Sequence, residues 1–129
     1  MNGSAFIAIL NSSAAIKNKL GDPVRVYPSV LPQDVTYPAG AYRIVSLQPH
    51  HSLNNTSELD DYGLDLHLYG QNHADLEDVE ATIANEIQAL QGTYSGIEVV
   101  DVLRMGVADD YLEEIRIFTK TPEYIITTR

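Results

Sequence analysis

The sequence predicts a single α+β domain in which a largely antiparallel sheet carries two helices packed on one face. Strand-type segments follow one another directly at 41–69 and 97–119, which is typical of hairpins. Two other segments, 4–20 and 73–90, repeat their apolar residues at helical spacing. The expected order is therefore α-β-β-β-α-β-β, with a short last strand at 124–126.

Length and composition bound the class of protein. With 129 residues, of which 44% are hydrophobic, one globular domain over residues 1–129 is expected. The absence of cysteine excludes disulfides, zinc-thiolate sites and thiol catalysis. No stretch approaches the ~20 apolar residues that span a bilayer, and the first residues do not read as an export signal. We therefore expect no membrane partner.

The net charge of −10 is unevenly distributed. Residues 1–57 carry four basic and two acidic side chains, whereas residues 58–129 carry four basic and sixteen acidic ones. An acidic surface repels phosphate, so tight sequence-specific DNA binding is not expected. The acidic half either lines a passage along which DNA slides or forms a solvated exterior, and composition leaves both open.

In the first half of the chain, glycine and proline mark the boundaries of the elements. The helix at 4–20 ends at a Gly-Asp-Pro sequence, and a short strand at 24–27 follows. Three prolines make the connection at 28–38 extended and irregular. The strand at 41–47 then leads into the polar stretch 48–57, which we predict to be a hairpin loop.

The strand at 58–69 alternates apolar and polar side chains and leads into a helix. Such alternation gives a strand one apolar face, here Tyr62, Leu64, Leu66 and Leu68, with Asp61, Asp65, His67 and Tyr69 on the other. The helix at 73–90 begins with a capping-box-like sequence. Its predicted apolar stripe comprises Leu76, Val79, Ile83, Ile87 and Leu90, and Glu77, Asp78, Glu80 and Glu86 lie off it.

The C-terminal region predicts one long hairpin and a final apolar segment. The strand at 97–107 is expected to turn at Asp109-Asp110 and to return at 111–119. Pro122 then interrupts the chain, because proline cannot donate a ladder hydrogen bond in a central strand. Residues 121–129 either form a C-terminal arm that pairs with a neighbouring subunit or fold back on their own sheet.

No cluster of side chains indicates catalysis or a metal site. His67 and His73 would meet near Asp65 or Asp75, but their spacing matches no recognised ligand pattern. Adjacent carboxylates such as Asp60-Asp61 diverge on a strand and do not form an acid–base pair. We therefore expect no enzyme, no cofactor and no catalytic or metal-binding residue.

Tyrosine is frequent, with eight residues against two phenylalanines and no tryptophan. Tyrosine suits subunit interfaces, where one end is dry and the other polar, but it also favours strands. The candidate intersubunit contacts are Tyr111, Tyr124, Ile125 and Ile126.

Four sequence segments resemble the tail-completion or tail-terminator family of long-tailed bacteriophages, which includes proteins of gene-transfer particles. The segments are Arg25-Val26-Tyr27-Pro28, Tyr42-Arg43-Ile44-Val45-Ser46, Leu68-Tyr69-Gly70 and His73-Ala74-Asp75-Leu76-Glu77-Asp78-Val79. The resemblance covers residues 5–92, and beyond them it concerns only the order of elements.

The resemblance implies a structural virion protein of the phage neck that assembles as a homo-oligomeric, commonly hexameric ring. Such rings cap the tail tube protein, dock on the head–tail connector or stopper and leave a channel for DNA; assembly takes place in the host cytoplasm. The family has no catalytic residues. The candidate channel or docking loop comprises His50, His51, Asn54, Asn55, Glu58 and Asp60. Alternatives are another neck component such as an adaptor or stopper, a non-viral ligand-binding α+β module, and a small enzyme with an unrecognised site.

Overall fold

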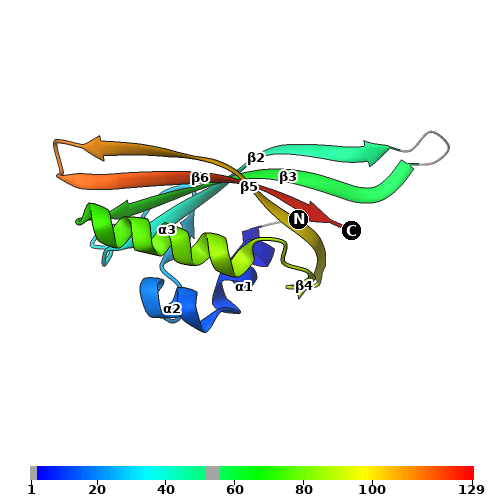
Figure 1. Ribbon diagram of the computed structural model, residues 1–129, viewed down its shortest axis with the longest axis horizontal. Coiled ribbons are helices and arrows are strands. Elements are labelled where there is room, and N and C mark those ends of the chain that lie inside the picture. Colours follow the sequence, from blue (N-terminus) through cyan, green and yellow to red (C-terminus); the bar gives the residue numbers. More distant parts are fainter. Residues whose placement is uncertain (1–2, 52–55) are drawn as a thin grey trace.

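The computed structural model describes residues 3–51 and 56–129, except for the side chains of residues 50–58, and it confirms the predicted α+β class. Within these ranges there are three helices and six strands. The strands form one sheet, and the helices lie beneath it (Figure 1). In chain order they are α1 (Gly3–Asn11), α2 (Ala14–Leu20), β1 (Val26–Pro28), β2 (Ala39–His51), β3 (Thr56–Gly70), α3 (His73–Ile87), β4 (Gly92–Tyr94), β5 (Ile97–Leu112) and β6 (Ile117–Thr128).

The six strands form a single twisted sheet in the order β1-β2-β3-β6-β5-β4. All neighbouring strands are antiparallel except β1 and β2, which are parallel. The helices cover one face, and the β2–β3 and β5–β6 hairpins project from the centre in opposite directions (Figure 1). No helix of the described residues lies on the other face, which we call the helix-free face.

The core lies between the sheet and the helices. Leu64, Leu66 and Leu68 of β3 are buried there, as the alternation of their strand predicts. Buried side chains from all three helices and from β6 meet them in one cluster, including Phe6, Ile16, Ile83 and Ile126.

The first predicted helix is two helices, because two serines interrupt it. The Ser12 hydroxyl donates to the Ile9 carbonyl oxygen at 2.6 Å, and the Ser13 hydroxyl accepts from the Ile16 amide as the N-cap of α2. Serine side chains compete with the helix backbone in this way. The bend allows both Phe6 on α1 and Ile16 on α2 to reach the core.

Helix α3 begins as predicted but ends at Ile87, so Leu90 packs against the core from beyond the helix. The rest of its predicted stripe is buried, and one further residue departs from the prediction. The Asn72 side chain accepts from the Asp75 amide at 3.1 Å and caps the helix. The further exception is Glu80, which is only 4% exposed although it was expected off the apolar stripe. It is buried because Arg104 of β5 binds it, with Nε 2.7 Å and Nη2 2.5 Å from Oε1.

The prediction of a loop at 48–57 is wrong over most of its length. β2 continues to His51 and β3 starts at Thr56, with Gln48 opposite Asp61 and Pro49 opposite Asp60. This part of the hairpin lies beyond the core. It has no apolar face to bury, and the backbone hydrogen bonds between its two strands stabilise it.

The predicted turn at Asp109-Asp110 is also wrong. β5 continues to Leu112, and the turn is at 113–116. The Asp109 carboxylate lies 2.8 Å from Nζ of Lys120, its cross-strand neighbour, so it is stabilised inside the ladder rather than at a turn.

β6 occupies the centre of the sheet, between β3 and β5. The folded-back arrangement of residues 121–129 is therefore the one observed, and Pro122 does not end the strand. The β3–β6 ladder is interrupted between Asp65–Glu123 and Leu68–Lys120, where proline lacks its donor, while Pro122 still lies opposite Val107 of β5.

Candidate assembly surfaces

The two projecting hairpin ends dominate the surface. We call residues 43–49 and 59–62 the β2–β3 arm and residues 103–119 the β5–β6 arm; they lie at opposite ends of the molecule (Figure 1). In each arm the two strands are consecutive in the chain and pair with one another as a hairpin. Each arm extends beyond the helices, so its side chains lack the helical cover that buries the middle of the sheet.

Exposed apolar side chains concentrate on the two arms. Among the described residues ten large hydrophobic side chains are exposed, and nine of them lie on the arms. These are Ile44, Val45 and Leu47 on one arm and Leu103, Met105, Val107, Tyr111, Leu112 and Ile115 on the other. Monomeric proteins rarely gather apolar surface in this way, so the arms indicate contacts with other protein subunits.

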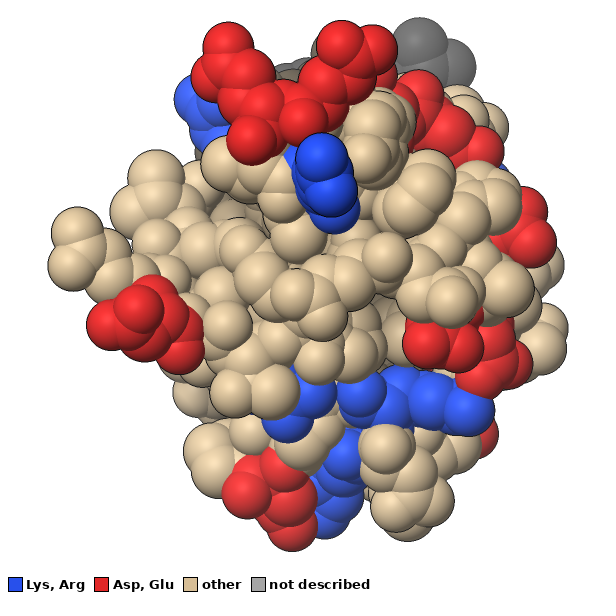
Figure 2. Space-filling view, turned by 90° about the vertical axis from the view of Figure 1, so that its left-hand side faces the viewer, with Lys and Arg blue, Asp and Glu red and all other residues tan. Residues whose placement is uncertain are grey.

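The charges of the two arms differ. The β5–β6 arm carries Asp109, Asp110, Glu113 and Glu114, and acidic side chains gather at the top of the view that looks onto this end of the molecule (Figure 2). On the β2–β3 arm, Arg43 is exposed and has no ion-pair partner within the described ranges. Arg43 is therefore complementary in charge to the acids of the other arm, while Asp60 and Asp61 lie on its own arm and Arg116 on the other.

The helix-free face of the central sheet is acidic. Asp65 lies opposite Arg43 on β2 and Glu123 on β6, and one of its oxygens is buried without a hydrogen bond from any described residue. Asp61 accepts a 2.6 Å hydrogen bond from the Thr127 hydroxyl. This face therefore presents negative charge at the middle of the molecule.

His67 and His73 have separate partners and do not meet at a common site. His67 Nδ1 lies 3.2 Å from the Thr121 hydroxyl, and His73 Nε2 lies 3.1 Å from a Glu77 carboxylate oxygen. The His73 ring also packs against Phe118, with 5.6 Å between the ring centroids. In the described part of the chain, no three metal-binding side chains come together.

The candidate intersubunit contacts fall into two groups. Tyr111 is 40% exposed on the β5–β6 arm, where its ring packs on Phe118 with centroids 4.6 Å apart, and Ile125 is half-buried on the helix-free face. Tyr124 and Ile126 are fully buried in the core of their own chain, so a neighbouring subunit cannot reach them. Their strand is central rather than terminal, which sequence order alone does not reveal.

The candidate docking loop is described only in part. Asp60 is half-buried on β3, between Pro49 of β2 and Thr128 of β6. Asn54 and Asn55, and the side chains of His50, His51 and Glu58, lie outside the described residues.

A buried polar cluster joins α3 to the sheet, and sequence reasoning missed it. Burial raises the pKa of Tyr124, the nearby Glu80 carboxylate raises it further, and Arg104 lowers it. The phenol therefore stays neutral, and its oxygen makes no hydrogen bond with the described residues. The ion pair between Glu80 and Arg104 links α3 to β5, and this role is structural.

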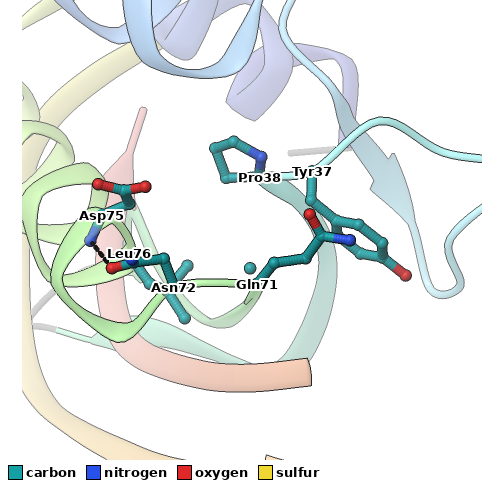
Figure 3. A pocket seen from close by; sticks show the side chains of 7 residues that line it. Tyr37, Pro38, Gln71, Asn72, Asp75 and Leu76 are labelled. Atoms are coloured by element: carbon teal, nitrogen blue, oxygen red, sulfur yellow. Dashed lines mark hydrogen bonds between the residues drawn. The ribbon is translucent and has the colours of Figure 1, made fainter. Parts of the chain in front are cut away.

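A small hollow opens at the N-terminus of α3 (Figure 3). Its volume is about 170 Å³, and Tyr37, Pro38, Gly70, Gln71, Asn72, Asp75 and Leu76 line it. Ligand pockets commonly measure about 300–1,000 Å³. The Asn72 side chain is engaged in capping, as the dashed line in Figure 3 shows, and Asp75 disfavours anions. The hollow is therefore a poor ligand site.

The fold and its surfaces define an α+β domain with two oppositely directed hairpin arms that expose apolar side chains. In the described ranges no group of side chains could hold a metal ion. None of the described helices is long and apolar enough to cross a membrane. Neither a protein-family model nor a curated protein matches the sequence.

Solved structures do match the fold. One is a chain described as "Virion of native gene transfer agent (GTA) particle", with a TM-score of 0.73 and 12% sequence identity. The alignment covers 98% of this chain and 95% of that chain. At this identity the likeness shows a shared fold, and it extends over both chains almost completely.

Proposed function

We propose that the protein is a structural virion protein of the phage neck, a tail terminator that forms a ring, caps the tail tube and joins it to the head connector. The observation that carries the proposal is the near-complete structural likeness to a chain of a gene transfer agent virion. Because both chains are covered almost fully, the likeness includes the arms as well as the core. The sequence resemblance to tail-completion proteins adds the specific role.

The arms support assembly into a ring. Their apolar patches differ in sequence and lie at opposite ends of one chain, so a contact between them is head-to-tail. Head-to-tail contacts give closed rings when the rotation between subunits closes. We propose a hexamer, with the tail tube protein and the head–tail connector or stopper as its axial neighbours in a particle assembled in the host cytoplasm.

The acidic helix-free face suits the wall of a DNA channel. Asp61, Asp65 and Glu123 lie on it, where they would repel the phosphate backbone and let DNA pass without binding. A solvated exterior is the alternative position for this face. Other neck components, such as an adaptor or stopper, would use similar surfaces. A ligand-binding module is less well supported, because within the described ranges the hollow at the N-terminus of α3 is small and the larger hollows on the β5–β6 arm are open to solvent rather than enclosed.

Electron microscopy of neck complexes tests the proposed function. We expect several copies of this protein in a ring around the tail axis, directly above the tube. Removing the protein from a particle-producing host should leave tails of uncontrolled length that are not joined to heads. A single copy lying off the axis, or normal tails in its absence, would contradict the proposal.

A further inference from the structure

Two strands leave long edges open within the described ranges. β1 pairs with β2 only as far as Tyr42, so the β2 edge is open from Arg43 onward. β4 covers only the first three residues of β5. Further along this edge, the Val102 carbonyl oxygen accepts a 2.9 Å hydrogen bond from the Ala89 amide. The β5 edge is therefore open from Leu103. Open edges present unpaired backbone donors and acceptors that another strand can satisfy.

The topology makes these two edges complementary between copies. The four long strands β2, β3, β6 and β5 are antiparallel in that order, so β2 and β5 run in opposite directions. A second copy in the same orientation, shifted along the strands, brings its β5 edge antiparallel to the β2 edge of the first. The open stretches lie at opposite ends of the molecule, so the two cores do not collide (Figure 1).

The side chains favour one register for this pairing. Arg43 lies on the helix-free face, opposite Asp65, and Asp110 lies on the same face, opposite Thr119. With Arg43 opposite Asp110, the bulge between Ile44 and Ser46 adds one residue and sets Leu47 opposite Val107. Opposite charges and apolar pairs both stabilise neighbouring strands.

Symmetric pairing of like edges is disfavoured. In a register centred on residues 109 and 110, two β5 edges would bring these aspartates of one copy against the same residues of another, and like charges directly opposite are destabilising. Two β2 edges would leave the apolar side chains of both β5–β6 arms uncovered.

We propose that residues 43–48 of β2 pair antiparallel with residues 106–110 of β5 in the next copy, so that one sheet continues from subunit to subunit. The occupant of each open edge is thus a second copy of this chain. The inference rests on the proposed ring and specifies the surface that joins its subunits.

Charge exchange tests the register. Arg43→Asp and Asp110→Arg should each raise the protein concentration needed for self-association by about tenfold, because each replaces an attraction by a repulsion. The two substitutions together should restore association, measured by analytical ultracentrifugation. If the double variant is as defective as either single one, the Arg43–Asp110 register is wrong.

Disulfide trapping tests the pairing itself, since the natural chain has no cysteine. In the proposed register the exposed Ser46 and Ala108 lie opposite one another on the helix-free face. We expect Ser46→Cys with Ala108→Cys to give a reducible ladder of dimers, trimers and larger species at high concentration. The matched control, Ser46→Cys with Asn85→Cys on the exposed side of α3, should give no ladder.

The outcomes separate this inference from the proposed function. Rings seen by native mass spectrometry without a disulfide ladder would retain the ring and overturn the edge pairing. Dimers from Ser46→Cys alone would show symmetric β2 pairing and also overturn it. A monomer at every concentration, with no ladder and no ring in neck complexes, would count against the ring and the edge pairing together.

Discussion

At the level of single residues, His67 and His73 have separate partners. His67 lies beside the Thr121 hydroxyl, and His73 contacts Glu77 and Phe118. We therefore expect the double substitution His67→Asn with His73→Asn to leave folding and particle assembly intact. Circular dichroism and electron microscopy check this. A stoichiometric metal in elemental analysis of the natural protein, lost with function in the double variant, would contradict the prediction.

Tyr124 is a buried residue with an unsatisfied polar group. Its hydroxyl finds no hydrogen-bond partner among the described residues, and leaving such a group unpaired costs about 1–3 kcal/mol. Tyr124→Phe should therefore leave the free energy of unfolding unchanged or raise it by up to about 1 kcal/mol. Denaturant unfolding measures the change, and a loss of stability would reveal a bond to the hydroxyl.

The same residue makes stability depend on alkaline pH. Burial raises the pKa of Tyr124 above the usual ~10, so the folded protein holds this proton more tightly than the unfolded chain does. Its contribution to stability is complete below pH ~10 and is lost progressively as the pH rises above that value. The Phe variant should lose less stability between pH ~9 and ~11 than the natural protein.

At the level of elements, α3 depends on Ile83. This side chain is fully buried in the cluster that contains Leu64 and Leu66. Ile83→Ala should therefore lower the free energy of unfolding by about 2–5 kcal/mol. The exposed Asn85→Ala on the same helix is the matched control and should change it by less than about 0.5 kcal/mol.

Deletion of residues 121–129 tests the position of β6. Tyr124 and Ile126 belong to the core, and their strand pairs with both β3 and β5. We expect the truncated chain to lose its cooperative thermal transition in circular dichroism. A truncated protein that keeps its melting temperature but no longer assembles would show that the segment serves a neighbour instead.

Sequence periodicity correctly predicted those strands and helices that bury one side against the core. The Leu64, Leu66 and Leu68 face and the stripe of α3 follow from spacing alone, because one side of each element is dry. Glu80 and Asp109 were misplaced because their positions depend on cations distant in sequence, Arg104 and Lys120. No local pattern announces such pairs.

At the scale of the whole molecule, the acidic charge should prevent DNA binding. With a net charge of −10 and an acidic helix-free face, the protein has few cations with which to displace counterions from a duplex. We expect no retardation of duplex DNA in gels at ~0.15 M salt. Retention at micromolar protein would contradict both this expectation and a channel that DNA traverses freely.

The assembly surfaces could be predicted less completely than the fold. Tyr111 was recognised as a candidate contact, but the exposed Val45, Leu47, Leu103 and Met105 were not. Their strands look like ordinary sheet strands in sequence, and exposure depends on where the helical layer ends. The edge of the helical layer depends on how long α3 is and how far the hairpins extend past it, so it can be seen only in the folded molecule.

The central position of β6 governs how the chain folds. β3 and β5 are both made before the strand that joins them, and β3 is separated from β6 by α3, β4 and β5. Until β6 inserts, each hairpin-forming strand exposes an inner edge that a β6 from another chain can occupy. The pairing of β3 with β6 is thus the non-local step of folding, whereas β2–β3 and β5–β6 are hairpins, and non-local pairing is slow. At high chain concentration, exchange of β6 between subunits is the characteristic error to which this topology exposes the protein.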